Sequence, residues 1–98
     1  LNKGPVIKIN ANTNYATTAE SSGIFEMICA DKKIPYQKFV NRSDVRGGGT
    51  IGSMIANNIG IRTVDVGNAM LAMHSARETA GVDDHWYMKE AMKGFLEY

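Results

Sequence analysis

The chain has 98 residues, of which 44% are hydrophobic, and a formal net charge of +1. This length corresponds to one small domain or to a piece of a larger one. The near-zero charge gives no electrostatic reason to expect binding to nucleic acid or to a membrane surface. No apolar run approaches the roughly 20 residues that span a bilayer. The single cysteine, Cys29, excludes an internal disulfide and fits a reducing compartment, so we expect a cytoplasmic protein.

The first strand and the first helix are indicated by short local patterns. Residues 6–10 form a mostly apolar run that is typical of a strand. Lys8 interrupts this run, and the residues alone favour an edge-strand lysine that faces water. Thr17 and Glu20 match a capping box, and apolar residues at helical spacing extend the helix to Lys32.

The middle of the chain continues the alternation of strands and helices. Residues 36–40 read as a second strand. Thr50 opens a helix of small residues over 51–58, and Gly60 closes it. The β-branched run 61–66 then predicts a third strand.

Two more helical signals follow. Ser75 and Glu78 match a second capping box, that helix breaks near Gly81, and Asp83 or Asp84 begins the last helix. The alternating order predicts an α/β fold with a mostly parallel sheet flanked by helices. Parallel strands need cover on both faces, so we expect this thin sheet to be an incomplete portion of a larger domain. The chain also begins without a methionine and stops inside an expected helix, which favours the same interpretation.

Three successive glycines, Gly47, Gly48 and Gly49, precede Thr50 at the start of the second helix. Glycines let a backbone approach a ligand closely, and a helix amino terminus favours anions, so a phosphate or carboxylate could bind there. The pattern is not a phosphate-binding P-loop, because Gly49 stands where the lysine should be. A flexible turn is at least as good an interpretation of the glycines alone.

His74 follows the third strand through a short loop, directly before the second capping box. Ligands of open α/β sheets bind at the carboxyl ends of strands, and imidazole is the commonest transition-metal ligand. A single histidine makes no metal site alone, so its partners are expected elsewhere. The triplet of Asp83, Asp84 and His85 resembles a ligand set, but acidic residues in a first helical turn more often complement the helix dipole and stay in water.

Several uncommon blocks of sequence occur together and in order. The chain closely resembles the carboxyl-terminal part of the aspartyl aminopeptidases, which are two-zinc exopeptidases. The resemblance covers nearly the whole length and is carried by Gly4-Pro5-Val6-Ile7-Lys8, Tyr15-Ala16-Thr17, Val40-Asn41-Arg42-Ser43-Asp44, Arg46-Gly47-Gly48-Gly49-Thr50-Ile51-Gly52, Gly60-Ile61-Arg62-Thr63-Val64-Asp65-Val66-Gly67 and Leu71-Ala72-Met73-His74-Ser75.

This resemblance implies a role for particular residues. His74 matches the last metal ligand of the co-catalytic pair, with zinc as the expected metal and cobalt or manganese as possible substitutes. Lys8 and Tyr15 match positions that line the substrate pocket, where a lysine would pair with an acidic first residue of the peptide. That role replaces the edge-strand interpretation of Lys8.

The glycine turn also has a counterpart in the family. Gly48, Gly49 and Thr50 match the loop that closes over the substrate, whose backbone N–H groups could face a carboxylate or an oxyanion. The general base and most metal ligands of the family lie upstream of these residues, in the rest of the same enzyme chain, together with a second domain. The resemblance implies a cytoplasmic homo-oligomer, a tetrahedral dodecamer, that acts on peptides.

Two hypotheses follow. In the first, residues 1–98 are the carboxyl-terminal segment of the catalytic domain of a metalloaminopeptidase and are inactive alone. They supply one metal ligand and part of a pocket for the amino-terminal residues of peptides, with acidic residues as the expected substrates. In the second, the chain is a stand-alone α/β module without enzymatic activity, which binds an anion or a protein partner through Gly47 to Gly49.

Overall fold

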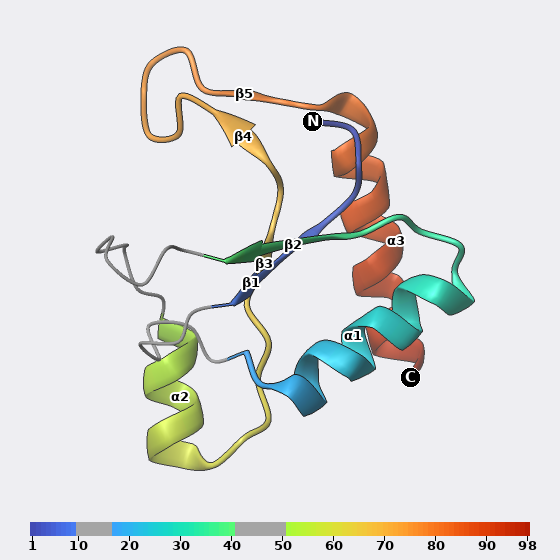
Figure 1. Cartoon of the computed structure of the whole chain (residues 1–98), viewed down its shortest axis with the longest axis vertical. Coiled ribbons are helices and arrows are strands. Elements are labelled where there is room, and N and C mark those ends of the chain that lie inside the picture. The colour runs from blue at the N-terminus through green and yellow to red at the C-terminus, as the bar shows by residue number, and fades with distance from the viewer. Residues whose placement is uncertain (10–16, 41–50) are drawn as a thin grey trace.

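A computed structural model describes residues 1–9, 17–40 and 51–98 (Figure 1). No helix among these residues is both long and apolar enough to cross a membrane. The elements in chain order are β1 (Val6–Ile9), α1 (Ala19–Asp31), β2 (Gln37–Val40), α2 (Ile51–Ile59), β3 (Val66–Gly67), β4 (Met70–Leu71), β5 (Thr79–Ala80) and α3 (Val82–Glu97).

The main sheet has the strand order β2-β1-β3. β1 and β2 are parallel, with Val6 opposite Gln37, as the strand–helix–strand order predicts. The α/β class is therefore confirmed. The third strand differs from the prediction, since β3 has two residues and runs antiparallel to β1, with Val6 opposite Gly67. A parallel β3 would need α2 to act as a crossover helix and to pack on the sheet. Gly52 is the only residue of α2 that is buried, so α2 does not pack in this way.

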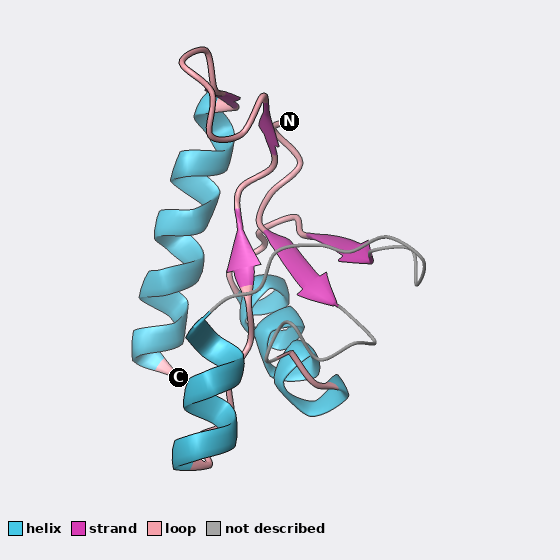
Figure 2. Ribbon diagram, turned by 90° about the vertical axis from the view of Figure 1, so that its left-hand side faces the viewer, coloured by secondary structure: helices cyan, strands magenta, loops and turns pink. Residues whose placement is uncertain are grey.

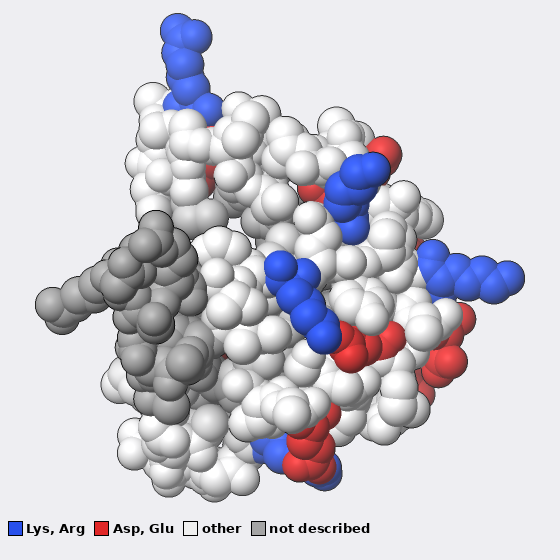
Figure 3. All heavy atoms as spheres, in the orientation of Figure 1, with Lys and Arg blue, Asp and Glu red and all other residues white. Residues whose placement is uncertain are grey.

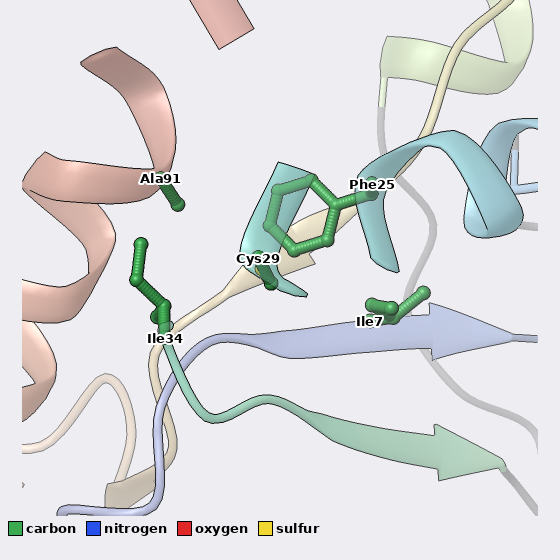
Figure 4. Close-up of a cluster of buried hydrophobic side chains, with 5 residues drawn as sticks. All are labelled: Ile7, Phe25, Cys29, Ile34 and Ala91. Carbon is green, nitrogen blue, oxygen red and sulfur yellow. The ribbon is translucent and has the colours of Figure 1, made fainter. Parts of the chain in front are cut away.

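The core lies where α1, α3 and β1 meet. Its buried side chains come from β1, from α1, from the link before β2 and from α3, and they point toward one another in Figure 4: Ile7, Phe25, Cys29, Ile34 and Ala91. The two helices pack closely at Gly94, where a Cβ atom would lie 2.8 Å from Ile28 Cγ2. Phe25 and Ile28, two of the apolar residues at helical spacing in α1, are buried on this face, whereas Met27 is exposed.

The first helix begins one residue later than predicted. Thr18, not Thr17, is the N-cap: its Oγ1 accepts from Ser21 N at 3.1 Å, and Ser21 Oγ accepts from Thr18 N at 2.9 Å. The Thr17 hydroxyl instead accepts a hydrogen bond from Asp65 N at 2.9 Å. The local pattern assigned the Thr17 hydroxyl to the helix cap, but this hydroxyl binds a backbone N–H that is 48 residues away in the sequence.

The last helix is fastened to the amino-terminal segment. It begins at Val82, with Gly81 as N-cap, and Asn2 Oδ1 accepts from Asp83 N at 3.1 Å. Asp84 is fully buried and accepts from Asn2 N at 2.8 Å and from Gly4 N at 2.9 Å. The expectation that both acidic residues stay in water is therefore wrong for Asp84, because its carboxylate binds two backbone donors that the helix does not supply.

Candidate functional site

His74 lies in the connection of the β4–β5 hairpin, which projects from the molecule far from α2 (Figures 1 and 2). The helix predicted after Ser75 does not form. Ser75 N donates to Ala72 O at 3.0 Å, and Ser75 Oγ accepts from Arg77 N at 3.2 Å. Glu78 Oε1 accepts from His74 N at 3.0 Å, so both members of the expected capping box close a tight turn instead.

The backbone around His74 has an uncommon conformation. Ala72 has a φ of 52° and His74 a φ of 69°, both in the left-handed region that side chains disfavour. Each such residue costs on the order of 1–3 kcal/mol and persists only where surrounding contacts hold it. The Glu78 carboxylate provides one such contact. The loop therefore presents an exposed histidine from a fixed backbone, which is an arrangement that functional sites often use.

The residues present fit one part of a zinc site. No group of three His, Cys, Asp or Glu side chains that could hold a metal ion occurs in residues 1–9, 17–40 and 51–98. An imidazole on a fixed, exposed loop is a suitable zinc ligand, so His74 would be one ligand, and the others would come from outside the described segments. The triplet at the start of α3 is not a second site, because the Asp84 carboxylate is buried on backbone donors while His85 is exposed.

Lys8 lies on the central strand of the sheet, not on an edge as the residues alone suggested. It is half-buried, and its N–H donates to Asp65 O at 2.9 Å, which extends the contact between β1 and the chain before β3. Its side chain lies over Gly67: a Cβ atom at that position would be 3.2 Å from Lys8 Cε and 3.4 Å from Lys8 Nζ. Sequence reasoning missed this glycine, because only the antiparallel register brings it to Lys8.

The glycine beside Lys8 and the metal-ligand candidate His74 lie on neighbouring segments of the chain. β3, which carries the glycine beside Lys8, ends two residues before β4, which leads to His74. Between these strands Asn68 has a buried Oδ1 that accepts no hydrogen bond from the described residues. Tyr15, Gly48, Gly49 and Thr50 lie outside the described residues, as does Gly47.

Charged side chains of one sign do not form a patch on the face of the molecule drawn in Figure 3. On the face shown in Figure 3, Lys and Arg side chains stand apart from one another, and acidic side chains lie between several of them. Two lysines form ion pairs with acidic side chains of helices: Lys38 Nζ lies 2.7 Å from Glu26 Oε1 of α1, and Lys32 Nζ lies 2.8 Å from Glu97 Oε2 of α3. Each pairing raises the pKa of its lysine through the hydrogen bond to the carboxylate.

The chain is similar in sequence to a family of metallopeptidases. The sequence pattern of the aminopeptidase I zinc metalloprotease family (M18) matches residues 1–96. The probable M18 family aminopeptidase 2 of Clostridium novyi is 51% identical over 98 residues, which are 100% of this chain and 22% of that protein. The protein of the same name from Pseudomonas aeruginosa strain LESB58 is 48% identical over 95 residues, covering 97% of this chain and 22% of that protein.

Solved structures agree with this relationship. A chain in the cryo-EM structure of the Ape4 and Nbr1 complex superposes with a TM-score of 0.95 at 41% identity, over 99% of this chain and 18% of that chain. The crystal structure of prApe1 gives a TM-score of 0.91 at 30% identity, over 97% of this chain and 20% of that chain. The chain thus spans about a fifth of the length of the relatives it matches. Because the family pattern covers residues 1–96 and the fold agrees with solved members, this chain belongs to the M18 family of zinc aminopeptidases.

Proposed function

We propose that residues 1–98 form the carboxyl-terminal segment of the catalytic domain of a two-metal aminopeptidase that removes amino-terminal residues from peptides. The upstream part of the catalytic domain and a second domain would complete the enzyme. The observation that carries this proposal is the His74 hairpin. His74, which we assign as the last metal ligand, is exposed on a loop with two left-handed residues, within a chain whose family match is almost complete.

His74 would hold one metal ion of the pair through an imidazole nitrogen, with zinc as the metal and cobalt or manganese as substitutes. When bound, such a metal pair polarises the scissile carbonyl and lowers the pKa of a bridging water. The protein's own contribution in this segment is orientation. Glu78 and the turn at Ala72 fix the backbone from which the imidazole projects.

The substrate pocket would receive the first residue of the peptide beside Lys8. Its ammonium group would pair with an acidic side chain there, and the half-buried position on the central strand supports this role, because partial burial strengthens an ion pair. Tyr15 would line the same pocket, and the backbone N–H groups of Gly48, Gly49 and Thr50 would close over the substrate.

The enzyme would be a cytoplasmic tetrahedral dodecamer. The family match favours this proposal over a stand-alone binding module.

The experiment that tests the proposal replaces His74 in a full-length enzyme that carries this segment. We expect His74→Ala to remove metal and to reduce kcat/KM by more than about 100-fold, because loss of a residue that merely orients a ligand already costs 10–100-fold. Metal content by mass spectrometry and hydrolysis of a peptide substrate are the measurements. The melting temperature of the metal-free protein should change little, because His74 is exposed.

The matched control is His85→Ala, since the chain has two histidines and both are exposed. We expect the His85 variant to keep its metal and its activity. Unchanged metal content and activity in the His74 variant would contradict the proposal, as would equal losses in the two variants.

A further inference from the structure

Gly67 and Lys8 lie on the same face of the sheet. The antiparallel register sets Gly67 opposite Val6, and residues two apart on a strand share a face, so Lys8 is the diagonal neighbour of Gly67. Long side chains reach such diagonal neighbours. The Lys8 side chain does so here, and its last two heavy atoms, Cε and Nζ, lie nearest to the place of the missing Cβ.

The backbone gives no reason for a glycine at this position. Gly4 and Gly60 have positive φ values, whereas Gly67 does not. Glycine also weakens a strand, because it loses more conformational freedom on folding and packs no side chain. A glycine inside a strand often marks a place where another group approaches closely.

The group that approaches is the end of the Lys8 side chain. A Cβ at residue 67 would lie 3.2 Å from Lys8 Cε, whereas non-bonded carbon atoms prefer about 3.5–4.0 Å. Even the smallest side chain at residue 67 would therefore push the lysine end away by a few tenths of an ångström, and a branched one would push it further. The empty space beside Gly67 is what allows Lys8 to extend along β3.

We propose that Gly67 is a positioning residue for substrate selection: the absence of a side chain there fixes where Lys8 presents its ammonium group to an acidic first residue of the peptide. This inference rests on the proposed function, because it needs Lys8 to contact the substrate. Gly67 itself touches neither metal nor substrate and acts only through Lys8. Selection for acidic residues is thus set by β3 as well as by the lysine on β1.

The test uses a full-length enzyme that carries this segment and two substrates that differ only in the first residue, one acidic and one neutral. We expect Gly67→Ala to lower kcat/KM for the acidic substrate several-fold and Gly67→Val to lower it further. A displacement of about 1 Å in a positioning group can cost about 100-fold, and this sets the upper range. The neutral substrate should be hydrolysed at the original rate, so the ratio of the two kcat/KM values carries the result.

Gly23→Ala is the matched control, because nothing lies within 4 Å of a Cβ built on Gly23. It should leave the ratio unchanged. The double variant of Lys8→Ala and Gly67→Ala should have the same ratio as Lys8→Ala alone, because Gly67 acts on the ratio only through Lys8. Should Gly67→Val fail to fold, the alanine variant and the double variant still decide.

The outcomes separate the two levels of the proposal. If Lys8→Ala leaves the ratio unchanged, the proposed role of Lys8 fails, and the inference about Gly67 fails with it. If Lys8→Ala changes the ratio but Gly67→Ala does not, only the inference about Gly67 is overturned. An equal loss for both substrates in Gly67→Ala would also overturn it, because a positioning role predicts a loss for the acidic substrate alone.

Discussion

The molecule has a packed region and an open region. The packed region consists of β1, α1 and α3, where Ile7, Cys29 and Ala91 have no exposed surface. The open region consists of α2 and the β4–β5 hairpin, where residues 71–80 are all exposed and α2 presents Ile51, Met54 and Ile59 to solvent.

The difference between the regions sets the proposed metal ligand apart from the main core. The packed region has its own core and a buried carboxylate that holds the amino-terminal segment on α3. The proposed metal ligand lies in the open region, and the glycines proposed to cover the substrate directly precede α2. The ligands of a metal site that one segment forms by itself tend to be buried against one another, whereas His74 is exposed. This contrast agrees with a chain that spans about a fifth of its relatives' length.

The largest expected effect comes from an experiment that shortens one side chain in each region. Phe25 is 5% exposed and Met54 is 62% exposed. We expect Phe25→Ala to destabilise the protein by about 3–5 kcal/mol, because it leaves a cavity in the core. Met54→Ala should change stability by no more than about 0.5 kcal/mol if α2 stays open to solvent. Melting temperatures of the two full-length variants are the measurement.

Similar losses in both variants would abolish the contrast for the full-length enzyme, because α2 would then be covered as deeply as Phe25. A small loss in both would instead mean that the core of the packed region contributes little. Either result would change which part of the chain we regard as the structural support of the site.

Local sequence patterns predicted the continuous elements best, including α2 of the open region, which was expected over 51–58 and spans Ile51–Ile59. The strand at residues 6–10, the first helix and the second strand all appear within two residues of their expected bounds. These elements are continuous runs bounded by turn residues, so short-range information is sufficient. The shifts that did occur came from distant partners: Asp65 N bonds to Thr17, and the caps of α3 involve Asn2, at the other end of the chain.

The candidate site was less predictable. The capping-box pattern at Ser75 predicted a helix, but the same side-chain oxygens serve a turn in the hairpin. The direction of β3 depends on where α2 packs, which no local pattern records. His74 was indicated by its place after a predicted strand, and the family resemblance gave it the role of the last metal ligand. The substrate role of Lys8 came from the resemblance alone, since the residues by themselves favoured an edge-strand lysine. Gly67 requires the register between β1 and β3 and could not be found from the local pattern or from the resemblance.

An intermediate effect is expected at the contact between the amino-terminal segment and α3. Asp84→Asn keeps the size of the side chain but replaces one acceptor oxygen with an NH₂ group, so the N–H of Asn2 or Gly4 loses its partner. We expect a loss of about 1–3 kcal/mol, the cost of a buried unpaired polar group. Faster hydrogen exchange in the peptide that contains residues 1–9 would locate the effect.

Asp83→Asn is the control, because Asp83 is exposed and only its backbone N–H bonds to Asn2. It should alter neither the melting temperature nor the exchange of that peptide by a comparable amount. Equal effects of the two substitutions would indicate that the charge of the first helical turn matters more than the buried hydrogen bonds.

The smallest expected effect concerns Cys29 and appears only at alkaline pH. Burial, with a smaller contribution from the charge of Glu26, raises the pKa of the thiol from 9.0 to about 11. The unfolded chain therefore loses this proton at lower pH than the folded chain, so the stabilising contribution is complete below pH 9 and disappears as pH rises toward 11. The same burial should keep Cys29 from reacting with iodoacetamide at pH 9 until the protein is denatured, which peptide mass mapping can measure.

Cys29→Ala isolates the contribution of this thiol to the pH dependence of stability. The variant should be less stable at neutral pH, because the buried sulfur is lost. Its melting temperature should nevertheless decline less steeply between pH 9 and 11 than that of the parent protein. Rapid alkylation of Cys29 in the folded parent would contradict the assignment of α1 to the packed region, because the reagent can reach the thiol only if α1 separates from β1 and α3. The reactivity of one buried thiol thus reports whether the packed region stays closed while the open region presents His74.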